Sequence, residues 1–338
     1  MPFSVKGTLL LKEDHRSLEK AAQIIKSGGL VAFPTETVYG LGAAANNAAA
    51  VARIYRAKGR PPDNPLIVHL SDCDQLKSVA RNIPDKAFDL ASCFWPGPLS
   101  IVLTRNEKIP ALVSAGLPSV AVRMPDHQSA LELIHLSGVP IAAPSANLSG
   151  RPSPTNYRHV LEDLTGRIEA VIKSTPCKVG VESTVLDLTR EQPVILRPGG
   201  VSKEQLEKIL GENILIAELE KQNGTPLSPG MKYRHYSPEA RLILITGLAS
   251  MRFTVIKILA AYYLKLGFKV GYLNTSLQGS LKCNASPEQL ASTLYDSMRR
   301  MDQQGIDIIL AEEISPAGLG LAVMNRLKKA ATRILHVG

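Results

Sequence analysis

LEKAAQIIKSGGLVAF, residues 18–33, joins a helical pattern directly to a strand pattern. Four apolar residues in its first half recur at the spacing of one helix face: Leu18, Ala21, Ala22 and Ile25. Gly28 and Gly29 then supply a stop for the helix, and the apolar run 30–33 predicts a short buried strand. A helix that leads into a buried strand indicates an α/β protein.

The chain continues with the same two kinds of element as far as residue 197. Helical spacing predicts further helices over 46–57, 75–81 and 85–94. Strand patterns follow at 66–70, 99–104, 119–123, 140–143, 170–173, 183–188 and 193–197. Because the helices and strands do not alternate strictly, we expect a twisted mixed sheet and not a series of βαβ units.

A second domain is predicted after residue 238. Residues 217–239 lose periodicity and become polar and rich in Gly and Pro, which is typical of a linker. Strands then alternate with helices, at 241–246, 249–266, 269–273, 287–303, 307–311, 319–330 and 333–337. This alternation predicts a small Rossmann-like parallel sheet. We therefore expect a first domain over 1–215, a linker over 216–238 and a smaller domain over 239–338.

Composition narrows the class of protein. A chain of 338 residues with 45% hydrophobic content suits two globular domains. No apolar run predicts a membrane span or a secretory signal, so we expect a cytoplasmic protein. The four cysteines form no C-x-x-C pair, which argues against a zinc site or a disulfide framework. The net charge of +9 is diffuse, so it favours anionic ligands in general.

Four unlike motifs carry the candidate chemistry: FPTETVYGLG (33–42), KGRPPDNPLIVH (58–69), APSANLSGRPSPT (143–155) and GVEST (180–184). Lys58 and Arg60 suit a phosphate chain, because phosphate is bound by charge-assisted hydrogen bonds. Taken alone, they could equally be the basic last turn of a helix. The hydroxyl and amide groups of the third motif follow another predicted strand and add to the case for a nucleotide site.

In chain order, these motifs closely resemble those of the threonylcarbamoyl-AMP synthase family, the YrdC-like enzymes that begin threonylcarbamoyladenosine modification of tRNA. The resemblance covers most of the chain and implies a YrdC-like catalytic domain over 1–215. The family pattern K-x-R with S-x-N is present as Lys58, Arg60, Ser145 and Asn147. The resemblance makes Lys58 and Arg60 catalytic and implies an ATP site formed by Lys58, Arg60, Asn64, Ser119, Ser145, Asn147, Ser153 and Arg197.

The linker motif SPGMKYRHYSP (228–238) is dense in donors and rings. In the two-domain branch of the family, the equivalent segment folds over the active site. The resemblance therefore makes the linker a possible lid, with Tyr233 as a gate residue and His235 and Tyr236 also on the ATP side. A flexible spacer is the plainer interpretation.

The resemblance also implies a threonine site formed by Thr35, His69, Arg123, Ala143 and Ser183. Singly, these side chains could be a turn residue, a buried strand histidine, a surface arginine and a strand cap. Arg123 ends a predicted strand whose alternation places it with Ala121 and Ser119. Its planar fork is well shaped for the threonine carboxylate.

The implied reaction condenses L-threonine, bicarbonate or carbon dioxide, and ATP into threonylcarbamoyl-AMP and pyrophosphate. The product serves the tRNA position next to the anticodon, through the tRNA threonylcarbamoyl-transferase machinery. A Mg²⁺ ion would travel with ATP, held mostly by nucleotide oxygens and water, with no protein side chain assigned as its ligand. No general base stands out among the motifs.

Two other classes of protein match parts of this sequence less well. GLGAAA (40–45) loosely matches a dinucleotide-binding loop, but it stands six residues after the predicted strand and lacks a suitable acidic partner. A non-catalytic RNA-binding module would fit the pI of 9.3, and direct tRNA binding stays open. Such a module has no need of the threonine set, and the aromatic content of 5% offers few stacking platforms.

Overall fold

The computed structural model describes residues 3–5, 7–217, 236–273 and 286–338. The chain divides into two compact units. The first consists of Met1–Ser149 and Ser153–Lys232, and the second of Gly150–Pro152 and Tyr233–Gly338. The predicted fold class, a mixed-sheet α/β unit with a smaller parallel-sheet unit, is confirmed. Most of the predicted linker 216–238 lies outside the described residues, so its bounds and its role as a lid stay predictions.

In the described part of the chain, the first unit is built on one mixed sheet of thirteen strands. Its strands are β1 (Phe3–Val5), β2 (Thr8–Leu11), β3 (Val31–Phe33), β4 (Gly40–Ala44), β5 (Ile67–His69), β6 (Ala80–Arg81), β7 (Leu99–Arg105), β8 (Ser119–Arg123), β9 (Ile141–Ala143), β10 (Ala170–Ile172), β11 (Thr184–Asp187), β12 (Val194–Arg197) and β13 (Leu215–Ile216). The order is β1-β2-β10-β3-β4-β9-β5-β8-β7-β11-β12-β13, with β6 paired to β7. Neighbours are parallel in some places, as in β5 with β8, and antiparallel in others, as in β3 with β4.

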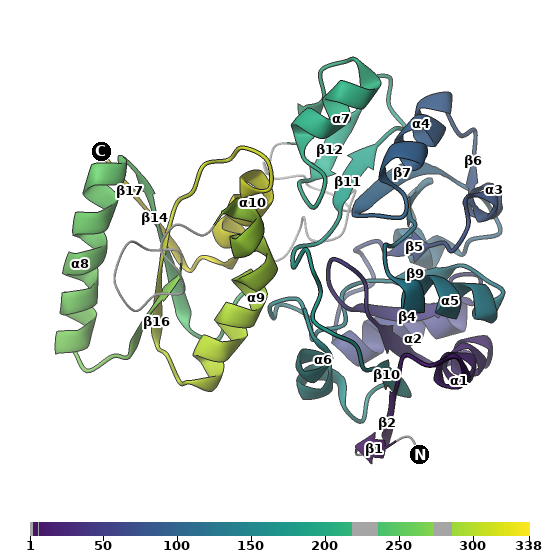
Figure 1. Ribbon diagram of the computed structural model, residues 1–338, viewed down its shortest axis with the longest axis horizontal. Helices are drawn as coiled ribbons and strands as arrows, with labels where there is room; N and C mark the ends of the chain where they lie inside the picture. The colour runs from purple at the N-terminus through teal and green to yellow at the C-terminus, as the bar shows by residue number, and fades with distance from the viewer. Residues whose placement is uncertain (1–2, 6, 218–235, 274–285) are drawn as a thin grey trace. The chain divides into compact units, whose positions relative to one another are not determined.

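The helices of this unit are α1 (His15–Lys26), α2 (Ala48–Lys58), α3 (Leu76–Val79), α4 (Asp85–Phe94), α5 (Gln128–Ser137), α6 (Tyr157–Leu164) and α7 (Lys203–Leu210). α1 begins where an Asp14 carboxylate oxygen accepts a hydrogen bond from the Ser17 amide, 2.9 Å away. It buries the four apolar residues that its spacing predicted, and it packs against α5. Figure 1 shows these two helices side by side.

The helix expected over 75–81 is wrong in length. Only the single turn α3 forms, because the next two residues become strand β6. Ala80 pairs with Arg105 and Arg81 with Thr104 of β7. This pairing with β7 holds the two residues in strand geometry instead of helical geometry. The sequence pattern also missed the short helices α5, α6 and α7, although Ser202 and Gln205 form a capping box at the start of α7.

Strand β4 was read from sequence only as a loose glycine motif. Its glycines leave room for the Phe33 ring, which lies against them. A Cβ atom added at Gly42 would stand 2.9 Å from Phe33 Cε1 and 2.7 Å from Ile141 Cγ2. At Gly40 it would stand 3.0 Å from Phe33 Cζ and 3.4 Å from the Cβ atom of Ala143. The Phe33 ring also packs against the His69 ring in a T-shaped contact, with 5.7 Å between the centroids.

The second unit has a four-stranded parallel sheet in the order β15-β16-β14-β17. Its strands are β14 (Arg241–Gly247), β15 (Val270–Leu273), β16 (Ile308–Glu312) and β17 (Arg333–Val337), and its helices are α8 (Ala249–Lys265), α9 (Pro287–Gln303) and α10 (Gly320–Ala330). In Figure 1, α8 covers one face of this sheet, whereas α9 and α10 lie together on the other. In neither unit does a helix among the described residues have the length and apolar character to cross a membrane.

Candidate functional site

Lys58 and the S-x-N motif lie together. Lys58 is the last residue of α2, which ends at Gly59 in the left-handed region, with φ 60°. Its buried ammonium group donates hydrogen bonds of 2.5 Å to the backbone carbonyls of Ser145 and Asn147. The Ser145 hydroxyl in turn donates to the Asn147 side-chain oxygen over 2.6 Å. The lysine of the K-x-R pattern and the S-x-N motif therefore form one cluster.

Arg60 and Asn64 occupy the loop that enters β5. The Arg60 guanidinium donates to the backbone carbonyls of Asn64 and Pro65, at 3.1 and 3.2 Å, and stacks near the Tyr55 ring. The Asn64 side chain is fully buried, and neither its oxygen nor its nitrogen has a hydrogen-bond partner among the described residues. Because Ile67 stands opposite Ala121 in parallel strands, Ser119 lies at the end of the sheet where this loop enters.

Arg123 lies at the opposite end of β8 and is almost completely buried. Its Nε donates to the Gly97 carbonyl over 3.1 Å, and its Nη1 donates to the Thr37 hydroxyl over 3.0 Å. Its Nη2 stands 2.6 Å from Glu36 Oε2, an ion pair whose angles fall short of a hydrogen bond.

The Thr35 hydroxyl holds the loop 34–39 in shape and connects it to Arg123. It donates to the Val38 carbonyl over 2.7 Å. It also lies 2.8 Å from the Thr37 hydroxyl, to which Arg123 donates. Thr35 and Arg123, both predicted on the threonine side, are therefore joined through Thr37.

His69 stands directly beside Arg123, because the two are paired in the register of β5 and β8. Burial, helped by the Arg123 guanidinium, lowers the pKa of the His69 imidazole to about 3. The ring is therefore neutral at physiological pH, and its Nδ1 lies 3.1 Å from the Ile67 carbonyl oxygen. Ala143 is the partner of Ile67 in β9 and the small residue beside Gly40. The Phe33 ring contacts His69, and Phe33 and Ala143 both lie beside Gly40.

Ser183 and Arg197 form a third group. The Arg197 guanidinium donates to the Ser183 carbonyl and to its hydroxyl, at 3.0 and 3.1 Å, and this hydroxyl lies 2.8 Å from that of Ser100. Gly199 passes so close that an added Cβ atom would stand 2.2 Å from the Ser183 carbonyl carbon. The glycine is required here for close approach of two backbone segments.

The other predicted residues are spread more widely. The Ser153 hydroxyl donates to Glu182 over 2.6 Å. Tyr236 belongs to the second unit, where its buried ring stacks on Tyr295 with 5.5 Å between centroids. Tyr233 and His235 lie outside the described residues. The roles assigned to all of these side chains stay predictions.

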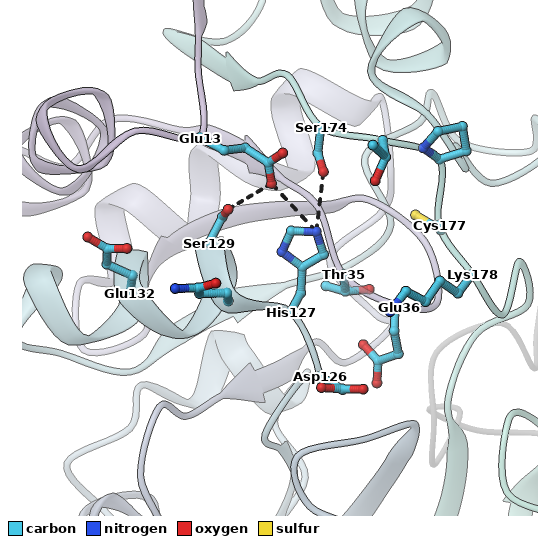
Figure 2. A pocket seen from close by; sticks show the side chains of 13 residues that line it. Glu13, Thr35, Glu36, Asp126, His127, Ser129, Glu132, Ser174, Cys177 and Lys178 are labelled. Carbon is cyan, nitrogen blue, oxygen red and sulfur yellow. Dashed lines mark hydrogen bonds and ion pairs between the residues drawn. The ribbon is translucent and has the colours of Figure 1, made fainter.

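Thr35 and Glu36 form part of the wall of a cavity of about 440 Å³. Figure 2 shows the side chains that line it. Its other walls come from Glu13, the segment 126–129, Glu132 and the segment 174–178. The His127 ring points toward Glu13 and Ser174, 3.7 and 3.3 Å from its Nε2. Of the predicted threonine set, the cavity wall includes Thr35 alone. Within the described ranges, no group of three or more His, Cys, Asp or Glu side chains is placed to hold a metal ion.

Sequence reasoning missed two side chains at this site, Glu36 and Thr37. Both contact Arg123, and both stand inside the motif FPTETVYGLG. An acidic residue between two threonines was therefore a visible signal. Its partner, 87 positions later in the chain, was not visible in the local pattern.

Comparisons with known proteins cover almost the whole chain. A family model described as "Telomere recombination" matches residues 23–199, and one described as "Threonylcarbamoyl-AMP synthase, C-terminal domain" matches residues 201–332. The threonylcarbamoyl-AMP synthase of Pyrococcus abyssi is 50% identical over 94% of this chain and 95% of its own length. That of Bacillus subtilis is 46% identical over 95% of this chain and 94% of its own. A crystal structure of P. abyssi Sua5 complexed with L-threonine, 48% identical, superimposes with a TM-score of 0.93 over 97% of this chain and 99% of that one.

Proposed function

Because the chain belongs to the threonylcarbamoyl-AMP synthase family, we propose that it joins L-threonine, bicarbonate and ATP into threonylcarbamoyl-AMP for tRNA modification. The protein is an enzyme of the nucleotidyltransferase class. ATP and threonine are its substrates. The observation that carries the assignment of residues is the gathering of Lys58 with Ser145 and Asn147, beside a sheet whose β5 and β8 end in His69 and Arg123.

We assign the ATP phosphates to the cationic side chains Lys58, Arg60 and Arg197, with Asn64, Ser119, Ser145, Asn147 and Ser153 as polar partners. Lys58 is now held by carbonyl oxygens, which are weaker acceptors than phosphate oxygens. Binding ATP would therefore draw its ammonium toward the nucleotide. The unpartnered amide of Asn64 supports the same assignment, because a buried amide without partners is costly unless a ligand satisfies it.

The chemistry proceeds by positioning and charge neutralisation. The threonine amine and bicarbonate form a carbamate and water. A carbamate oxygen attacks the α-phosphorus of ATP, the bond to the β-phosphate oxygen breaks, and pyrophosphate leaves. No covalent enzyme intermediate is required. The arginine and lysine side chains offset the charge that gathers on the phosphates.

Several finer assignments belong to the same proposal. A Mg²⁺ ion enters with ATP and is coordinated by phosphate oxygens and water. Residues 216–238 act as a lid, with Tyr233, His235 and Tyr236 as its gate residues. The protein works in the cytoplasm and hands its product to the tRNA threonylcarbamoyl-transferase machinery. The second unit supports the lid or regulates the first.

The test is mass spectrometry of a short reaction that contains the protein, Mg²⁺, ATP, L-threonine and isotopically labelled bicarbonate. Omitting each substrate in turn supplies the controls. Labelled threonylcarbamoyl-AMP and pyrophosphate that require all three substrates are the expected result. If ATP binds but no labelled adduct forms, the chain is a binding protein and the proposal is wrong.

A further inference from the structure

Glu36 combines burial with a vacant hydrogen-bonding position. Its side chain is 5% exposed, and its Oε2 pairs with Arg123. Its Oε1 is buried and has no hydrogen-bond partner in the part of the chain that the structure describes. The residue also forms part of the cavity wall, as Figure 2 shows. A buried carboxylate oxygen without a partner is costly, so this position is built to receive a donor.

Arg123 complements Glu36, because its guanidinium has N–H donors left for a ligand. A guanidinium carries five N–H groups in a fixed fork. The described hydrogen bonds engage Nε with Gly97 and Nη1 with Thr37, whereas Nη2 pairs with Glu36 without hydrogen-bond geometry and has no hydrogen-bond partner among the described residues. The N–H groups of Nη2 therefore remain for an anion. The pair offers a positive and a negative group side by side, which matches the two charged ends of a free amino acid.

The charge of the cavity decides which end faces it. Carboxylates line it at Glu13, Glu36, Asp126 and Glu132, against the single ammonium of Lys178. Burial lowers the pKa of His127, so this ring adds no positive charge near neutral pH. The field in the cavity therefore favours a cation and opposes a phosphate.

We propose that Glu36 binds the α-ammonium group of threonine and takes a proton from it, while Arg123 binds the carboxylate. This inference rests on the proposed function. The ammonium gives one proton to the Glu36 carboxylate, which leaves a neutral amine and a carboxylic acid. The amine nitrogen then forms a bond to the carbon of bicarbonate, and water leaves to give the carbamate. Glu36 returns its proton to solvent through the cavity, whose rim residues Asp126, Gln128 and Thr175 are exposed.

Other titratable groups nearby are poorly suited to this step. The His69 imidazole does not line the cavity, and its Nδ1 already lies 3.1 Å from the Ile67 carbonyl oxygen. The Cys177 thiol lines the same cavity, but burial raises its pKa to about 12, so it carries no negative charge. Glu182, also buried, already accepts a hydrogen bond from Ser153. Arg123 from β8 pairs with Glu36. The other charged or titratable groups that line its cavity are Glu13, Asp126, His127, Glu132, Cys177 and Lys178.

The first experiment measures the rate of threonylcarbamoyl-AMP formation by the full chain from pH 7 to 9.5. We expect Glu36→Gln to lower kcat about 10²–10⁴-fold near pH 7.5, the usual contribution of a positioned base. The deficit should shrink as pH rises, because solution then supplies threonine with a free amine. Glu107→Gln changes a carboxylate that is 86% exposed and lies outside this cavity, so it should stay within about twofold of wild type. A Glu36→Gln rate close to wild type, or a deficit that does not change with pH, overturns the proposal.

The second experiment measures binding of L-threonine and of 3-hydroxybutanoate, which lacks the α-ammonium group. The wild type should prefer threonine, and Glu36→Gln should lose most of that preference while keeping its affinity for ATP. If the glutamine variant does not fold, Glu36→Asp retains the carboxylate and should retain the preference. Equal preference in wild type and Glu36→Gln, or a loss of preference in Glu36→Asp as large as in a folded Glu36→Gln, contradicts the assignment. A wild type that makes no threonylcarbamoyl-AMP would instead refute the proposed function.

Discussion

The buried ion pair of Arg123 and Glu36 predicts that Glu36→Gln changes the free energy of unfolding in opposite directions when Arg123 is present and when it is replaced. Their charged atoms lie 2.6 Å apart, and the side chains are 4% and 5% exposed. Arg123→Met leaves the carboxylate buried and unpaired, so we expect it to lower the free energy of unfolding by about 3–5 kcal/mol. Glu36→Gln alone should cost less, about 1–3 kcal/mol, because the guanidinium keeps its contacts with Thr37 and Gly97.

In the Arg123→Met background the same glutamine substitution removes an unpaired charge. It should therefore stabilise the protein, and the double variant should be more stable than Arg123→Met alone. Urea denaturation of the four proteins in the absence of substrate measures the coupling energy, which we expect to be about 2–3 kcal/mol.

The exposed pair Arg81 and Glu107, 3.6 Å apart, is the matched control. Its coupling should be below about 1 kcal/mol. If Glu36→Gln costs the same free energy in both backgrounds, the two charges do not stabilise each other and the reasoning is refuted.

Three further outcomes can be checked independently. Gly199→Ala forces a collision with the Ser183 backbone, so it should cost about 1–3 kcal/mol in urea denaturation and weaken threonine binding in calorimetry; unchanged values would contradict the close approach. Lys58→Ala should slow pyrophosphate release at least about 10²-fold in a coupled assay, whereas Lys26→Ala, in the last turn of α1, should not; equal rates would remove Lys58 from the ATP site. His69 has a folded pKa of about 3 against an ordinary value of 6.5, so the unfolded chain binds a proton that the folded one excludes. The free energy of unfolding should therefore fall as pH drops from 6.5 toward 3, and His69→Gln should flatten that slope; an unchanged slope would count against the burial argument.

Local patterns predicted the elements that carry their own signals. α1 shows its apolar face, its N-terminal cap and its glycine stop within one continuous stretch. The strands β7, β8 and β12 are apolar runs that read as strands in any context. The K-x-R and S-x-N motifs stood out for the same reason, since each is compact in the chain.

Elements defined by distant neighbours could not be predicted in this way. β4 has the composition of a loop, and it becomes a strand because the Phe33 ring fills the space that its glycines leave. Ala80 and Arg81 continue a helical pattern but are drawn into pairing with β7. In both cases the deciding contact is made by the neighbouring strand, which is β3 for β4 and β7 for Ala80 and Arg81.

Glu36 illustrates how such distant neighbours create the site itself. In the sheet, β3 and β8 are separated by β4, β9 and β5, about 19 Å at the usual spacing between strands. The loop 34–39 therefore has to reach across the ends of the intervening strands. Two contacts outside the loop hold it there: the Tyr39 amide donates to Pro154, and Val179 donates to the Glu36 carbonyl.

Gly40, Gly42 and Ala143 are small, which leaves space for the Phe33 ring to pack against the His69 ring. The threonine site that we propose, with its two opposite charges, thus depends on a loop from one part of the sheet and a strand end from another. Its two charges become a single recognition element only when the mixed sheet is complete. This explains why the four motifs are far apart in the sequence, and why a substitution such as Gly42→Ala, remote from any charge, should weaken threonine binding.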